Sequence, residues 1–243
     1  MRFERIVILL AALAASAGTA RLGLWQLDRA AQKNALQSAL DTRRALPPIT
    51  QEALARDEAT ATAQHHRNVT LHGQWMKAST LFLENRQMNG RVGFYVLTPL
   101  ALDDGTAVVV QRGWLPRDAN ERMRVTAPSL PAGEVQLVAR IAPTPARLYE
   151  LGAAASGVIR QNLDLASYAQ EIGRPLRPLS VLQLSATGGI EDGVQRDWPQ
   201  AASDVHKHYG YAFQWFALAA LIVALYVWFQ LISPSRASRR AKT

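Results

Sequence analysis

The feature that most constrains this chain is an uncharged apolar stretch near its C-terminus. The stretch Tyr209–Ile232 holds 24 residues without a formal charge. As a helix rising about 1.5 Å per residue, it is longer than the hydrocarbon core of a bilayer, which is about 30 Å thick. Tyr and Trp residues gather at both of its ends, as they do at membrane interfaces. The sequence therefore predicts a transmembrane helix at residues 206–232.

A second apolar segment, residues 6–25, lies near the N-terminus and admits two interpretations. Arg2 and Arg5 precede it and Gly18-Thr19-Ala20 resembles a cleavage site, as in a secretory signal peptide. The apolar character resumes beyond that site and ends on Trp25, a residue type that anchors helices at membrane interfaces. We therefore favour an uncleaved first span. Its small residues would let another helix approach closely: Ala11, Ala14, Ala15 and Gly18.

The positive charge of the chain lies mainly in its two tails. Of the net +8, residues 1–5 carry +1 and residues 233–243 carry +4, which leaves +3 for residues 6–232. A nucleic-acid-binding face is therefore not expected. Because positive residues flank the outer ends of both spans, the positive-inside rule places both tails in the cytoplasm. Residues 26–205 are then expected on the opposite, periplasmic side.

The segment between the spans has the pattern of a β-rich domain. Short alternating apolar runs are separated by turn dipeptides such as Asn89-Gly90. Residues 164–172 read as a short helix that Gly173 ends, and Thr50 is expected to cap another. The predicted fold is membrane-anchored and mainly β: two transmembrane helices flanking an antiparallel β-barrel or sandwich with one or two short helices.

The sequence carries no recognisable catalytic or metal-binding motif. The chain has no cysteine, which excludes disulfides, thiolate metal sites and cysteine nucleophiles. His65-His66 and His72 have no acidic partner at ligand spacing, so we expect no metal site and no catalytic residue. The box Arg112–Pro116 has two interpretations: a surface for a partner or an anion, or a strand corner with Trp114 packed inside. We favour the second.

Four boxes in order along the chain resemble the Surfeit locus protein 1 family of cytochrome c oxidase assembly factors. They are Leu22–Arg29 (LGLWQLDR) with Lys33, the run from Asn85-Arg86 through Gly90 and Gly93 to Thr98-Pro99-Leu100, Arg112–Pro116 (RGWLP), and His208–Phe216 (HYGYAFQWF).

The resemblance implies a non-enzymatic assembly factor that assists haem a insertion into subunit I of cytochrome c oxidase. Its implied partners are subunit I and haem a synthase, and its implied location is the inner membrane. The short N-terminus without an Arg- and Ser-rich transit segment favours a bacterial source. Two alternatives stay open: a structural scaffold that holds oxidase subunits without binding haem, and a membrane-anchored periplasmic enzyme.

His208 is the residue that we expect to bind the cofactor. Ser203 or Asp204 is expected to cap the second span, which places His206 and His208 in its first turn. One helical face then carries a ligand, a small residue and an aromatic wall, which suits a flat apolar macrocycle: His208, Ala212, Trp215, Ala219 and Ile222. We therefore predict that His208 is an axial ligand of haem a. The other interpretation is an interfacial histidine that packs against Trp25 or Arg29.

Overall fold

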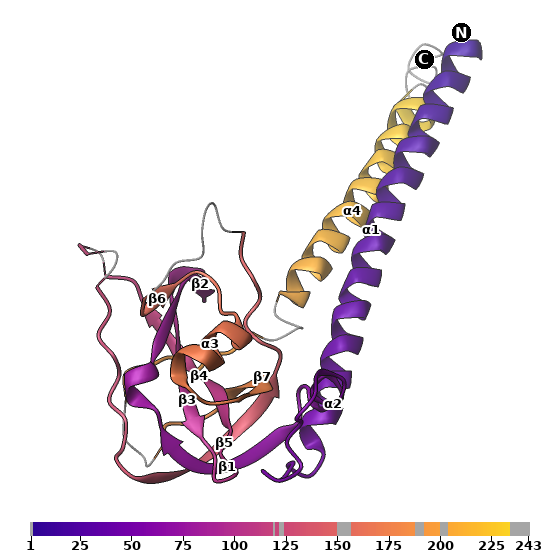
Figure 1. The fold of residues 1–243 in the computed structure, drawn as a ribbon. Coiled ribbons are helices and arrows are strands. Elements are labelled where there is room, and N and C mark those ends of the chain that lie inside the picture. Colours follow the sequence, from indigo (N-terminus) through magenta and orange to yellow (C-terminus); the bar gives the residue numbers. More distant parts are fainter. Residues whose placement is uncertain are drawn as a thin grey trace, which may run out of the picture. The chain divides into compact units, whose positions relative to one another are not determined.

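A computed structural model of the chain is shown in Figure 1. It describes residues 2–118, 120–121, 124–149, 157–187, 192–199 and 204–233. The basic C-terminal tail and Ser203, a candidate cap, lie outside these residues. Two compact units are distinguished: the two ends of the chain (residues 1–39 and 200–243), and residues 40–199.

Two long helices belong to the two ends of the chain. Helix α1 spans Arg2–Ala45, and α4 spans Val205–Val227 and continues as a π-helical turn, Trp228–Ile232. By length and composition, both are long and apolar enough to cross a membrane. Helix α1 runs about 20 residues beyond its apolar part because no proline or glycine interrupts it before Pro47-Pro48.

Helices α1 and α4 lie side by side (Figure 1). The phenyl ring of Phe216 packs so closely on Gly23 that a Cβ at residue 23 would lie 2.8 Å from the ring. The less exposed stripe of α1 contains this contact: Ala12, Ser16, Thr19, Gly23, Gln26 and Ala30. The small residues that the sequence predicts to admit another helix lie outside this stripe and are exposed, and a Cβ at Gly18 would meet nothing within 4 Å, so close approach of another helix to them stays a prediction.

Residues 40–199 form a mixed seven-stranded sheet in the order β1-β5-β7-β4-β3-β2-β6. The strands are β1 (Asn68–Trp75), β2 (Leu81–Met88), β3 (Arg91–Ala101), β4 (Ala107–Pro116), β5 (Glu134–Ala142), β6 (Ile159–Arg160) and β7 (Leu176–Gln183). A short pairing of β1 with β3 joins Trp75 to Leu100, so five of the strands pair in a cycle.

The expectation of a wholly antiparallel barrel or sandwich is wrong in part. Strand β4 pairs in parallel with β7, and β2 pairs in parallel with β6. A parallel pair needs a long crossover between its strands. Here β5, β6 and α3 (Leu165–Ile172) lie between β4 and β7 in the chain and provide one.

Most of the turns and helix caps formed by glycine and aspartate lie where the sequence predicts them. Asn89 and Gly90 join β2 to β3 with φ values of 50° and 75°, as a two-residue hairpin of the predicted kind requires. Helix α3 begins after Asp164, whose carboxylate accepts a hydrogen bond from the Ser167 amide, and ends at left-handed Gly173. The expected cap at Thr50 is wrong, because α2 (Glu58–Gln64) begins later and is capped by Asp57.

Apolar side chains cover both faces of the sheet. The largest cluster joins β1, β5 and β7 through residues such as Leu71, Leu137 and Val181. Tyr168 of α3 packs on a second cluster that includes Leu83 and Leu97. A third cluster contains Met88, Trp114 and Trp198. Trp114 is fully buried in it. The sequence prediction that Trp114 packs inside is therefore confirmed.

Candidate functional site

The first turn of α4 carries the residue that the sequence predicts as a ligand. Asp204 occupies the N-cap position with φ 72°, and its carboxylate pairs with Lys207 Nζ at 2.8 Å instead of capping a backbone amide. His206 and His208 both follow within this turn, as predicted. His206 is exposed, whereas His208 is partly buried.

His208 is held by a residue of the first helix. Its Nδ1 lies 2.7 Å from Oε1 of Gln26. Because an amide oxygen only accepts hydrogen bonds, this contact places a proton on Nδ1, and in the neutral imidazole the lone pair is then on Nε2. Among the described residues, Nε2 has no hydrogen-bond partner. The partner that the sequence missed is therefore Gln26, next to Trp25 and inside the first sequence box.

The helical face expected to receive a macrocycle is the face that α4 presents to α1. The least exposed residues of α4 follow the predicted spacing: Val205, His208, Ala212, Trp215, Ala219, Ile222 and Tyr226. Ala212 is only 2% exposed, so no open space remains beside it. These residues share one face, as predicted, but packing of the two helices fills the space that the sequence predicts beside Ala212; binding of a macrocycle at His208 stays a prediction.

An iron bound by His208 would therefore be held through Nε2, the ring nitrogen that Gln26 does not contact. Histidines that bind metals usually donate their other ring N–H to an acceptor, which fixes the tautomer and the ring orientation. His208 and Gln26 have this arrangement. The residues present thus fit an imidazole ligand for a haem, with Gln26 positioning the ring.

The second and third boxes meet inside the β-rich unit. The Trp114 indole donates to the carbonyl oxygen of Arg86 at 2.9 Å. Each box lies at a β-bulge, one before Arg86 in the β2–β3 pairing and one at Arg112 in the β3–β4 pairing. A bulge inserts an extra residue and redirects the side chains around it. Both arginines point inward as a result and are almost fully buried.

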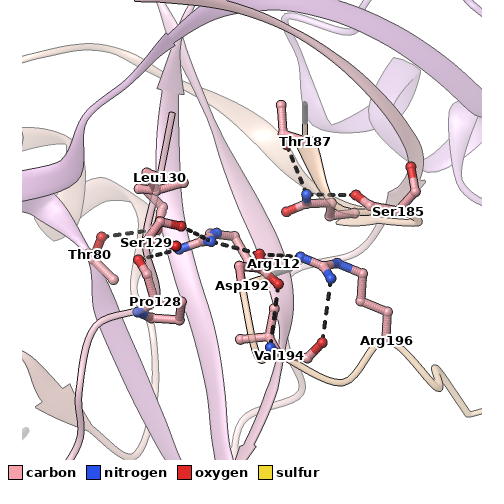
Figure 2. A network of polar contacts seen from close by, with 12 residues as sticks. Thr80, Arg112, Pro128, Ser129, Leu130, Ser185, Thr187, Asp192, Val194 and Arg196 are labelled. Carbon is pink, nitrogen blue, oxygen red and sulfur yellow. Dashed lines mark hydrogen bonds and ion pairs between the residues drawn. The ribbon is translucent and has the colours of Figure 1, made fainter. Parts of the chain in front are cut away.

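Arg112 is the centre of a buried polar network (Figure 2). Its Nη2 donates to Asp192 Oδ2 at 2.8 Å and to the Ser129 carbonyl oxygen at 3.0 Å. The same carboxylate also pairs with Arg196. Asp192 is the partner that sequence reasoning missed, since 80 residues separate it from Arg112. Arg112 is 1% exposed, so the interpretation of its box as a surface for a partner is wrong.

Gly113 is required where this network meets the strand corner. Its φ is 154°, and a Cβ there would lie 2.6 Å from the Gln195 carbonyl oxygen. The Trp114 amide and carbonyl both form hydrogen bonds with Gln195. The bulge at Arg112 and the segment around Gln195 therefore approach more closely than any side chain at residue 113 would allow.

Among the described residues, no group of three or more His, Asp or Glu side chains is arranged to hold a metal ion. His65 and His66 lie together at the end of α2. Burial, followed by nearby positive charge, lowers the pKa of both imidazoles.

Comparison with known proteins assigns these boxes to a single family. The model of the SURF1 family matches residues 13–220, which is most of the chain. The chain belongs to the SURF1 family. The match includes all four boxes, so the contact between His208 and Gln26 and the contact between Trp114 and Arg86 both lie within the SURF1 region.

Relatives of this SURF1-family chain occur in bacteria and in yeast. The SURF1-like protein of Rickettsia bellii is 22% identical over 209 residues, 84% of this chain and 83% of that protein. The SURF1-like protein of Rickettsia felis is 24% identical, over 85% of this chain and 89% of that protein. The cytochrome oxidase assembly protein SHY1 of Saccharomyces cerevisiae is 30% identical over 95 residues, 39% of this chain but 24% of that longer protein.

Proposed function

We propose that this protein is a membrane-bound, non-enzymatic assembly factor for cytochrome c oxidase that assists insertion of haem a into subunit I. Membership of the SURF1 family and the likeness to a yeast oxidase assembly protein support the assembly role. The contact between His208 and Gln26 carries the haem part of the proposal, since it joins the first and fourth boxes in the arrangement of a metal-ligating histidine.

The two helices perform distinct tasks in this proposal. Haem supplies an iron that accepts an imidazole nitrogen as an axial ligand. Gln26 keeps the proton on Nδ1 of His208, so that the Nε2 lone pair faces the iron. Apolar side chains that α1 and α4 expose within about two turns of Gln26 and His208 would contact the bound macrocycle: Leu22, Trp25 and Phe213 are examples.

The proposed location is the bacterial inner membrane, with both termini cytoplasmic and the β-rich domain periplasmic. It rests on Arg2 and Arg5 before the first span and on the basic tail after the second. Subunit I and haem a synthase are the proposed partners, because both lie in the same membrane and handle haem a.

Labelling of single engineered cysteines tests this topology. The chain has no natural cysteine, so Arg124→Cys and Arg240→Cys each introduce a unique thiol. In intact cells, a membrane-impermeant maleimide should label residue 124 and should not label residue 240 until the cells are broken. Labelling of residue 240 in intact cells, or a mature protein that starts near Arg21, would contradict the proposal.

Deletion of the gene tests the function. In a strain with one copy, deletion is expected to lower the haem a content and the activity of the aa3-type oxidase severalfold while its subunits are still synthesised. Haem content is measured from reduced-minus-oxidised membrane spectra, and subunit amounts by immunoblotting. Restoration by the intact gene is the control. A deletion strain with fully haemylated and fully active oxidase would reject the assembly role.

A structural scaffold is the alternative that shares the same membrane location. It would hold oxidase subunits without touching haem. Absorption spectra of the detergent-purified protein from cells that make haem a separate the two, because only a haem carrier co-purifies with a haem a spectrum.

A further inference from the structure

The β-rich unit contains a second candidate site, an open cavity of about 660 Å³. It lies between β2, β3 and the chain segments 140–148 and 198–199. Its volume falls within the range of small-molecule sites in proteins, which is about 300–1,000 Å³. All of its described lining residues belong to residues 40–199; they include Leu40 and Arg44 from the C-terminal end of α1, and His208 is not among them.

The charged lining of this cavity is entirely basic among the residues that the structure describes. Arg44, Arg86 and Arg140 line it together with His66, and neither Asp nor Glu does. Arg86 is only 6% exposed and donates to the carbonyl oxygens of Ala146 and Gln161, both at 2.7 Å. Its buried Nε has no hydrogen-bond partner within the described part of the chain. The guanidinium also lies over the ring of Tyr95, 6.0 Å from its centroid, so its partners among the described residues are neutral and none is a carboxylate.

Arg140 adds a second positive charge of the same kind. Its Nε is also buried without a hydrogen-bond partner. Burial, and next the positive charge of Arg44, lowers the pKa of Arg140, while Asp41 acts in the opposite direction. The carboxylate of Asp41 itself pairs with Arg44 at 2.9 Å. Arg86 and Arg140 are thus the two cations for which the cavity provides no direct carboxylate.

The remaining wall is aromatic and apolar. The rings of Tyr95 and Trp198 meet edge to face with centroids 5.5 Å apart. The indole N–H of Trp198 donates to the Gln183 carbonyl oxygen at 2.9 Å, which fixes the orientation of its ring. A rigid aromatic surface beside two cations fits a molecule that has both an apolar body and an acidic group.

Two residues with left-handed backbone conformations also line this cavity. Asn85 has φ 58° and lies at the β-bulge that turns Arg86 inward, and His66 has φ 69°. Left-handed residues other than glycine cost free energy and often occur at binding sites. The second sequence box, Asn85-Arg86, therefore contributes to the wall of a cavity as well as to the sheet.

We propose that this cavity binds an organic anion, with its carboxylate paired to Arg86 and Arg140 and its apolar body against Tyr95 and Trp198. A porphyrin with propionate groups and a fatty acid both have this chemistry, so the experiment includes each. The inference goes beyond the proposed function, because it requires neither iron nor His208.

Metal-free protoporphyrin tests the cavity separately from iron ligation. The detergent-purified full-length protein is titrated in an uncharged detergent, binding is followed by quenching of tryptophan fluorescence, and the signal from empty micelles is subtracted. We expect saturable binding that Arg140→Gln weakens about tenfold, because one charged hydrogen-bonding partner is lost. The exposed Arg124→Gln removes the same charge outside the cavity and should leave the affinity unchanged.

Two further titrations identify the class of ligand. The dimethyl ester of the porphyrin, which has no carboxylate, should bind at least tenfold more weakly to the unchanged protein. A long-chain fatty acid is tested in the same way, and binding of it alone with the same dependence on Arg140 would identify a lipid anion. Equal binding of the diacid and its ester, equal effects of Arg140→Gln and Arg124→Gln, or no saturable binding of either anion would overturn the proposal.

Discussion

Replacement of Asp192 by alanine is expected to lower the free energy of unfolding by about 3–5 kcal/mol. Its carboxylate accepts a hydrogen bond from Arg112 at 2.8 Å and also pairs with Arg196 (Figure 2). The side chains of Asp192 and Arg112 are 6% and 1% exposed. Removing this carboxylate leaves two cations without their negative partner, one of them fully buried, and neither is able to regain its hydration without disrupting the sheet.

Denaturant unfolding of the detergent-purified protein measures this effect. Glu171→Ala is the matched control, because it also removes a carboxylate from an ion pair with an arginine, Arg160. The side chain of Glu171 is exposed, whereas that of Asp192 is buried. Exposed ion pairs contribute at most about 1 kcal/mol, so the control should unfold nearly like the wild type. If Asp192→Ala were no less stable than Glu171→Ala, the network would not support the fold.

Acidification should reduce the difference between Asp192→Ala and the wild type. Burial by itself raises the pKa of Asp192, but the hydrogen bond and charge of Arg196 and the charge of Arg112 outweigh it, so the pKa lies below its ordinary value. A group whose pKa is lower in the folded state stabilises the fold above its unfolded pKa, about 3.9 for Asp. This contribution is lost as the pH falls through the folded value.

Local patterns in the sequence predicted the local structure well. The Asn89-Gly90 hairpin and the caps of α3 depend on a few adjacent residues whose backbone preferences are strong. The buried face of α4 followed from its 3/4 spacing, and the inward packing of Trp114 from the strand corner beside it. Each of these features is determined by residues close together in the chain.

Features that join distant parts of the chain could not be predicted. The parallel pairing of β4 with β7 depends on how α3 folds back on the sheet, which no turn dipeptide specifies. Asp192 was missed because nothing near it in the sequence indicates that it faces Arg112. The contact between Gly23 and Phe216 was not predicted, since alanine and glycine occur on several faces of α1 and nothing near Gly23 in the sequence indicates that Phe216 packs on it.

The candidate site was half predicted. His208 and its position in the first turn of α4 follow from the sequence. Its partner does not, because 182 residues separate Gln26 from His208; the sequence indicated Trp25 or Arg29 as its neighbour on the first helix. The cavity beside Arg86 was missed entirely, since its three arginines come from three separate segments of the chain.

His208→Ala is expected to abolish haem a binding. The substitution removes Nε2, the nitrogen that the Gln26 contact leaves available for iron, and no second histidine lies on the same face of α4. Gln26→Ala retains the ligand but not its orientation, so it should weaken haem binding by about 10–100-fold, the effect typical of removing a residue that hydrogen-bonds to a metal ligand. Both proteins should still insert into the membrane, because the apolar helices are unchanged.

His206→Ala is the matched control for this experiment. It removes an imidazole from the same helical turn, but from an exposed position that makes no contact with Gln26. Expression level and membrane fraction are compared among the three variants by immunoblotting before any spectrum is recorded. Differences in haem content are then referred to equal amounts of inserted protein.

The absorption spectrum of the protein purified from cells that make haem a tests the central claim most directly. We predict a haem a spectrum for the wild type and for His206→Ala, a weakened one for Gln26→Ala, and none for His208→Ala. A His208→Ala protein that purifies with an unchanged haem a spectrum would show that this histidine does not bind the iron, and would contradict the account.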